Sequence, residues 1–306
     1  MTEMRRLEPL QKGGVFERGR SSAVRSFDVT KDEVERLQKE RPGLIVEEEA
    51  GVILLSPERD VAWLHYGFGS VDALRQHFRP LLEKLVVALK KGEAPSGILL
   101  RFTDQPNRSY VEPVLVESFF ELQREWMEMK LIELPDERTP GDEVAPGFVL
   151  RLATPEDYDA VADLAREAFA ERMQRPFDAA YYAEGDNELR VLAEKKSGRM
   201  AGCIGLNRRE ERTGDIAVVA VHPDCQRRGL GEAMLCWSFA RFRQQGKRRA
   251  RLFVDMENTA AIALYRKLGF TPGQIGLTYR RPTDDKELKA MAQKKKGTHI
   301  VFGNWR

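Results

Sequence analysis

Apolar and polar residues along this chain form blocks with the spacing of helices and strands, and the blocks recur in a similar order in both halves. Short apolar runs predict buried strands, and apolar residues three and four positions apart predict amphipathic helices. In the first half we expect strands over 52–55, 61–68, 97–102 and 124–130, and helices over 30–38, 71–90 and near 111–117. In the second half we expect strands over 216–221 and 251–255, and helices over 230–243 and 258–268. Both halves therefore predict the α/β (α+β) class.

Helix starts can be placed from capping residues. Thr30 and Glu33 have the spacing of a capping box, in which each side chain accepts from the other residue's backbone N–H. Thr154 is expected as an N-cap, Pro155 as the first helical residue and Asp157 as an acid in the first turn. A polar helix is also expected over residues 284–295.

A boundary between the two halves lies at residues 135–147. This segment is rich in proline, glycine and charge and has neither apolar period. On each side lies a segment long enough for a domain of ordinary size.

The glycine loop at residues 226–231 lies between an expected strand and an expected helix. Gly229 and Gly231 permit positive φ, and the free N–H groups of a helix N-terminus attract anions. Arg227 and Arg228 add positive charge. The loop lacks the Lys and hydroxyl of a Walker A motif and the third glycine of a dinucleotide fingerprint. The pattern that remains is Gln-x-x-Gly-x-Gly, which would suit a diphosphate.

Three segments together resemble the GNAT superfamily of N-acetyltransferases. They are the loop at 226–231, the segment 258–270 with its Asn, Ala, Tyr and Gly-Phe, and the strand-to-helix entry at 151–157. The resemblance implies a catalytic domain over 148–281, a degenerate GNAT-like domain over 1–140 and a C-terminal tail over 282–306. Each domain would be an acyl-CoA N-acyltransferase-like fold, with a mixed, mostly antiparallel sheet flanked by helices.

The resemblance also assigns roles to residues of the second domain. In this superfamily the central strand splays from its neighbour, so that unpaired backbone groups meet the pantetheine arm of coenzyme A. Tyr265 would give a proton to the leaving thiolate. One N–H of the central strand would stabilise the oxyanion. Acetyl-CoA would be bound by Val219, Ala220, Val221, Gln226, Arg227, Arg228, Gly229, Leu230, Gly231, Glu232 and Asn258.

The general base is less evident from the sequence, because the strand over 216–221 contains no carboxylate. Asp215 is favoured, since it is nearest along the chain to the working strand. The other acids that we consider are Glu171, Glu184, Glu210 and Glu211. The acceptor pocket is expected over 169–188, where Tyr181 and Tyr182 either line the pocket or pack.

The first domain repeats the order of elements without the functional residues. On the pattern alignment, residues 60–67 face 215–221 and Phe119-Phe120 faces Gly269-Phe270. The turn over 67–70 is too short for the phosphate loop, and the position facing Tyr265 falls near Leu115. We expect a tandem duplication whose first copy kept the fold and lost the cofactor site.

Composition bounds the partners. The net charge of +2 is divided into −6 over the first 150 residues and +8 over the remainder, so the half with the anion loop is basic. No helix carries a long basic face with interleaved aromatics, so neither nucleic acid nor membrane is expected as a partner. No apolar run could serve as a signal peptide or membrane span, which favours a cytoplasmic location. A homo-oligomer is left open.

Cysteines and histidines give no metal or disulfide pattern. Cys203 and Cys236 are expected as core fillers and Cys225 at a loop position. The four histidines are scattered, so no metal is expected.

The residues and the resemblance together predict an acetyl-CoA-dependent N-acetyltransferase. It would move an acetyl group to a primary amine of unknown identity by direct attack in a ternary complex. The alternative is a non-catalytic acyl-CoA-binding regulatory module, because no base is evident. A nucleotide-binding α/β domain is a weaker interpretation, because the loop has the wrong residues.

Overall fold

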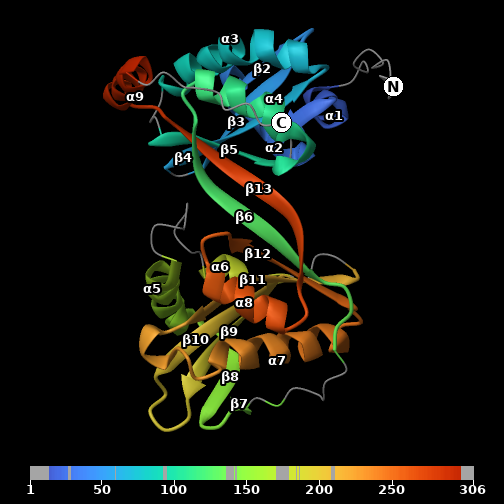
Figure 1. Ribbon diagram of the computed structural model, residues 1–306, viewed down its shortest axis with the longest axis vertical. Coiled ribbons are helices and arrows are strands. Elements are labelled where there is room, and N and C mark those ends of the chain that lie inside the picture. The colour runs from blue at the N-terminus through green and yellow to red at the C-terminus, as the bar shows by residue number, and fades with distance from the viewer. Residues whose placement is uncertain are drawn as a thin grey trace. The chain divides into compact units, whose positions relative to one another are not determined.

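The computed structural model divides the chain into two compact units (Figure 1). Unit 1 comprises Met1–Glu125 and Gly276–Arg306, and unit 2 comprises Trp126–Ile275. The residues that the structure describes are 14–26, 29–58, 60–91, 95–135, 141, 143–169, 179–183, 185, 187–207 and 211–297.

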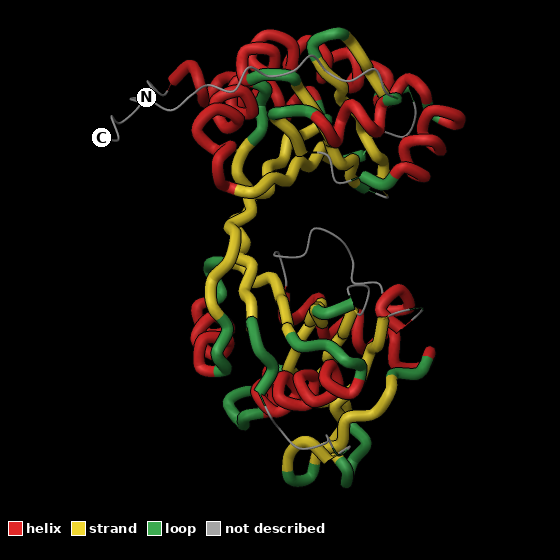
Figure 2. Tube along the Cα trace, turned by 90° about the vertical axis from the view of Figure 1, so that its right-hand side faces the viewer, coloured by secondary structure: helices red, strands yellow, loops and turns green. Residues whose placement is uncertain are grey.

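Unit 1 is a mixed sheet with helices packed against it (Figure 2). Its strands lie in the order β2-β3-β4-β5-β13, and β1 pairs with β4. All neighbours are antiparallel except β4 and β5, which run parallel. The elements are α1 (Val15–Ser21), β1 (Val24–Ser26), α2 (Lys31–Glu40), β2 (Ile45–Glu48), β3 (Gly51–Glu58), β4 (Val61–Phe68), α3 (Val71–Leu89), β5 (Gly97–Thr103), α4 (Asp104–Glu117) and α9 (Asp285–Gly297).

Unit 2 has a longer sheet, in the order β6-β12-β11-β10-β9-β8-β7. Here only β11 and β12 are parallel. The elements are β7 (Glu143–Ala145), β8 (Phe148–Leu152), α5 (Tyr158–Phe169), α6 (Ala179–Ala183), β9 (Asn187–Glu194), β10 (Met200–Asn207), β11 (Thr213–Val221), α7 (Leu230–Gln244), β12 (Arg249–Asp255) and α8 (Thr259–Lys267). Each unit therefore has the mixed, mostly antiparallel sheet that the sequence predicts.

Strands β6 (Glu121–Leu131) and β13 (Thr271–Pro282) each have residues in both units. From Trp126 onward β6 pairs with β12 in unit 2, whereas from Gly276 onward β13 pairs with β5 in unit 1. The residue ranges of the two compact units therefore differ from those of the expected domains, 1–140 and 148–281. Each half of the sequence contributes an edge strand to the sheet formed mostly by the other half.

The two faces of the unit 2 sheet are covered unequally. On the face that we call the α7 face, α7 and α8 pack on strands from β8 to β6, and the core includes Met127, Met129 and Leu252. On the opposite face, called the α5 face, the core formed with α5 and α6 reaches β9, β10 and β11. Within the described residues, no side chain of β12 or β6 belongs to that second core. Among the described residues, the core of the α5 face therefore does not extend over these two strands, although Glu128 of β6 is buried on that face.

The cap expected at Thr154 forms in full, whereas only one of the two bonds of the capping box expected at Thr30 and Glu33 is found. Thr30 is the N-cap of α2 and its Oγ1 accepts from the N–H of Glu33 at 3.2 Å, while Glu33 itself accepts from Ser56. Thr154 and Asp157 form a capping box before α5, and the Thr154 N–H donates to Asp157 at 2.8 Å. Arg151 pairs with Asp157 at 2.6 Å.

Phe119 and Gly269 occupy equivalent backbone positions in the two units. Each lies just after the helix that follows the second parallel strand of its unit, which is α4 after β5 and α8 after β12. Each has positive φ, 64° for Phe119 and 89° for Gly269. A non-glycine residue seldom adopts this conformation, so its recurrence agrees with the pattern alignment of the two halves.

Among the helices in the described part of the chain, none combines the length and apolar composition needed to span a bilayer.

Candidate functional site

The parallel strands β11 and β12 separate part of the way along their length. Their pairing covers Thr213–Ile216 on β11 and Arg249–Leu252 on β12. Beyond this point β11 continues to Val221 and β12 to Asp255 without pairing to each other. The register between β10 and β11 also shifts between Gly205 and Leu206, which leaves Ala217 as an extra residue. The sheet therefore opens between its two parallel strands.

The open edge of β11 presents the backbone groups of Val219 and Val221. Beyond the end of β11, the N–H of His222 donates to Ala201 O at 2.9 Å, so alternate N–H groups back along the strand point toward β10. The N–H groups of Val219 and Val221 consequently point away from β10, toward the opening. Val221 O accepts from the Gln226 side chain at 3.2 Å, which fits this direction.

The glycine loop follows directly after β11. Gly229 is the N-cap of α7 and has φ 74° and ψ 3°, in the left-handed region that glycine adopts readily. Arg227 also has positive φ, 58°. The first N–H groups of α7 have no partner within the helix, so they face the loop as donors for an anion. Gln226 to Gly229 are exposed, and the Arg228 guanidinium lies 4.8 Å from the ring centre of Phe148.

Gly231 has a different role from the one expected. It lies within α7 and does not have positive φ. A Cβ at Gly231 would lie 3.6 Å from Leu264 and 3.8 Å from Val221. These are ordinary van der Waals distances, so the packing of α7 on β11 and α8 has room for a Cβ at Gly231. Next to it, Glu232 pairs with Lys267 of α8 at 2.6 Å.

Tyr265 lies on α8, against the core of the α7 face. Its ring is 5.9 Å from that of Phe270, which is 5.8 Å from Phe239. Burial raises the pKa of the Tyr265 hydroxyl to about 12. The hydroxyl therefore stays protonated throughout the physiological range and keeps a proton that it can donate.

Asn258 caps α8, as one of its two expected roles requires. Its Oδ1 accepts from the N–H of Ala261 at 3.2 Å. This bond fixes the start of α8 just after the end of β12. Tyr265 lies about two helical turns after this N-cap.

Asp215, the residue that we favoured as general base, is held in an ion pair. Its two oxygens accept from Arg251 Nε and Nη2 at 2.7 and 3.0 Å, a bidentate ion pair. It also lies in the paired part of β11, before the opening.

Much of the expected acceptor region lies outside the described residues. These include Glu171, Glu184, Glu210 and the side chain of Tyr181. Tyr182 is half-buried on α6, beside Gly205 of β10. Glu211 is exposed before β11.

The cysteines are free thiols. Cys203 is fully buried, and burial raises the pKa of its thiol to about 12. Cys225 is also buried, although the sequence suggests a loop position. Among the described residues, no three His, Cys, Asp or Glu side chains gather as ligands for a metal ion.

Unit 1 has the same opening between parallel strands, but its own chain fills it. The pairing of β4 and β5 ends at Trp63 and Leu99. Beyond it β1 pairs with β4, Ser26 opposite Tyr66 and Val24 opposite Phe68. Because β3 occupies the other edge of β4 over the same residues, β1 lies on the edge that faces β5.

The equivalent strand of unit 2 lies elsewhere. There the entry strand β8 pairs with β9, far from the opening. In unit 1, Ser26 Oγ also donates to Arg101 O of β5, so β1 bridges both strands. The turn before α3 is short, and Ser70 caps the helix at the Ala73 N–H, 3.0 Å away. Unit 1 thus lacks both the open edge and the loop.

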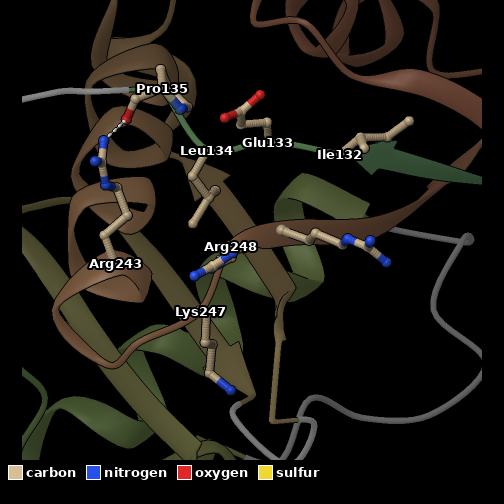
Figure 3. Close-up of a pocket in the computed structure, with 8 residues that line it drawn as sticks. Ile132, Glu133, Leu134, Pro135, Arg243, Lys247 and Arg248 are labelled. Carbon is tan, nitrogen blue, oxygen red and sulfur yellow. Dashed lines mark hydrogen bonds between the residues drawn. The ribbon is translucent and has the colours of Figure 1, made fainter.

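A cavity of about 650 Å³ lies at the other end of α7 (Figure 3). At this cavity the Arg243 guanidinium donates to the backbone oxygen of Pro135, and the side chain of Lys247 points away from Pro135. None of the expected site residues lines this cavity, which is bordered by Ile132, Glu133, Leu134, Pro135, Arg243, Lys247, Arg248 and Arg249.

The divided parallel strands and the glycine loop before α7 agree with the GNAT resemblance seen in the sequence. Residues 158–270 match the model of the Acetyltransferase (GNAT) family.

Relatives named mycothiol acetyltransferase extend the similarity. The protein from Saccharomonospora viridis is 30% identical over 204 residues, 61% of this chain and 62% of that protein. The one from Streptomyces coelicolor is 31% identical over 151 residues, 47% of this chain and 44% of that protein. The chain thus spans less than two thirds of either relative. The two-domain arrangement that we expect from the sequence is similar to that of mycothiol synthase.

Solved structures show the same fold. A GCN5-related N-acetyltransferase from Sphaerobacter thermophilus has a TM-score of 0.61 and 19% identity, covering 84% of this chain and 86% of that one. A tandem GNAT protein from the clavulanic acid biosynthesis pathway has a TM-score of 0.53 and 13% identity, covering 77% and 79%.

Proposed function

We propose that this protein transfers an acetyl group from acetyl-CoA to a primary amine by direct attack in a ternary complex, with the site in unit 2. The observation that carries the proposal is the opening beyond Ile216 and Leu252, followed at once by the loop at 226–231. This arrangement joins a row of backbone donors to an anion site in one cleft. The family match and the named relatives support acyl transfer as the reaction class.

The residues present fit acetyl-CoA as the donor substrate. The exposed loop and the start of α7 would take its diphosphate, with Arg227 and Arg228 as added charge. The edge of β11 would pair with its pantetheine arm. The bound thioester supplies an activated acyl carbon, and the N–H of Val219 or Val221 would donate to its oxygen as negative charge develops.

Tyr265 would act as a hydrogen-bond donor to the leaving sulfur. Its pKa of about 12 exceeds that of an ordinary thiol by about 3 to 4 units, so full proton transfer in the resting environment would be uphill by about 5 kcal/mol. A hydrogen bond to a forming thiolate does not require that transfer, and is worth about 1.5–3 kcal/mol.

Calorimetric titration of the whole chain with acetyl-CoA tests the binding site. One equivalent is expected, because β1 fills the opening of unit 1. Two equivalents would show that unit 1 also binds, and no binding would contradict the proposal. Binding without thiol release over a broad set of amines would instead favour a non-catalytic acyl-CoA-binding module.

Tyr265→Phe tests the chemistry. We expect kcat to fall about 10- to 100-fold, because the lost interaction is made to charge that develops during the reaction. The KM for acetyl-CoA should change by no more than about twofold. An unchanged kcat would remove Tyr265 from the mechanism.

A further inference from the structure

Phe253 is a large apolar side chain left exposed on an interior strand of unit 2. Its exposed fraction is 54%, although β12 lies between β11 and β6. It meets Trp126 of β6 edge to face, with ring centres 5.1 Å apart and planes at 84°. Apolar rings on inner strands are normally covered, so the exposed Phe253 ring, with the half-buried Trp126 ring against it, suggests a contact surface.

The pair lies on the α5 face, beside the opening. Leu252 and Val254 belong to the core under α7, so Phe253 between them points to the other face. Phe253 is also the first residue of β12 beyond the stretch paired with β11. Trp126 is on the same face, because it lies opposite Asp255 in the antiparallel register.

The charged groups around the pair are satisfied by one another. Arg251 binds Asp215 and lies 5.7 Å from the centre of the Phe253 ring. Glu128, which is buried, pairs with Lys130 at 2.9 Å. With these charges paired, the surface next to the opening is dominated by the aromatic rings.

The direction of approach follows from the covered face. The helices α7 and α8 and the loop at 226–231 occupy the α7 face, where the donor substrate would enter. An acceptor that reaches a thioester held in the opening must therefore come from the α5 face. On that side, the part of β12 that borders the opening carries the side chain of Phe253 and then that of Asp255.

We infer that the rings of Trp126 and Phe253 form the surface that the acceptor substrate contacts. The acceptor would be a primary amine attached to a ring or to another apolar group. This inference rests on the proposed acetyl transfer. An apolar body buries area against the rings, whereas a flexible polyamine gains little there and loses conformational freedom. The amine would project past the rings toward the opening, near the Asp255 carboxylate.

Thiol release from acetyl-CoA with two sets of primary amines tests the inference. Cyclohexylamine and 2-phenylethylamine represent apolar bodies, and ethanolamine and putrescine represent polar, linear ones. We expect kcat/KM to be about tenfold higher for the first set. Phe253→Ala should remove about that factor and leave the KM for acetyl-CoA unchanged. Phe253→Tyr, which keeps the ring, should retain the preference.

Leu152→Ala is the matched control, because Leu152 is an equally exposed apolar residue, 57%, on the distant strand β8. It should change neither parameter. Turnover without preference, or equal effects of Phe253→Ala and Leu152→Ala, would overturn the inference and leave the proposed function intact. Absence of turnover with every amine would contradict the proposed function and the inference together.

Discussion

Replacement of Gly229 by alanine tests whether the loop before α7 holds the donor substrate. Gly229 has φ 74°, where a residue with a Cβ is less stable by about 1–2 kcal/mol. A Cβ at this position would meet no heavy atom within 4 Å, so the strain comes from the backbone alone. Gly229→Ala should therefore lower the free energy of unfolding by about 1–2 kcal/mol.

The effect on binding should be larger than the effect on stability. To relieve the strain, the backbone at Gly229 would rotate and turn the first N–H groups of α7 away from the anion. Loss of one hydrogen bond to a charged phosphate costs about 1.5–3 kcal/mol, which corresponds to about a 10- to 100-fold weaker Kd for acetyl-CoA. Isothermal titration calorimetry measures this change directly.

Gly246→Ala provides the matched control, since Gly246 follows the other end of the same helix. It has φ 77°, and a Cβ there would also meet nothing within 4 Å. The two ends of α7 are separated by about 22 Å. Both variants should lose similar stability in urea denaturation, but only Gly229→Ala should weaken binding. A Kd within twofold of the original protein, or equal weakening in both variants, would refute the assignment of the loop.

Two further predictions concern stability. Hydrogen bonds from Arg151 lower the pKa of Asp157 to about 2, so its folded pKa is below the unfolded value and its stabilisation is present above about pH 4 and lost as pH falls toward 2. Asp157→Asn should thus cost about 1 kcal/mol at pH 7 in urea denaturation and almost nothing near pH 2; a difference that persists in acid would contradict this assignment. Gly269→Ala should lower stability by about 1–2 kcal/mol, because its φ is 89° and its Cβ would lie 3.3 Å from Leu131. Phe119→Gly should be nearly neutral, because relief of positive φ offsets loss of the Arg79 contact; a loss as large as that of Gly269→Ala would argue against their equivalence.

Local pattern predicted the elements that carry the site. The expected strand over 61–68 matches β4, and the expected helix over 230–243 matches α7 to within one residue. Both segments are rich in apolar residues, and the glycine loop before residue 230 marks the start of the helix, so few residues suffice to define them. The positive φ of Gly229 also follows from its residue type and position.

Features that depend on pairing between distant strands were not accessible in the same way. Asp215 was favoured as a base because of its distance along the chain, whereas Arg251 neutralises it across a register that one sequence does not reveal. The placement of β1 in the unit 1 opening was missed because a strand of three residues, Val24–Ser26, carries almost no pattern. The sequence did contain a signal for the apolar surface at Phe253. This residue lies between Leu252 and Val254 in a strand, so its side chain must point to the face opposite theirs, although it is apolar.

The exchange of β6 and β13 has a consequence for how the protein can be divided. A fragment that begins after the boundary at residues 135–147 would lack β6, and with it the buried side chains of Met127, Met129 and Leu131. Loss of buried side chains of this size costs roughly 2–5 kcal/mol each, so the loss of three is comparable with the whole net stability of most domains. We therefore expect neither half of the chain to fold stably by itself, since the first half would likewise lack β13. On our hypothesis of a tandem duplication, the exchanged strands would hold the two copies in one chain even as their sequences diverged, which would explain how a half without a cofactor site is kept.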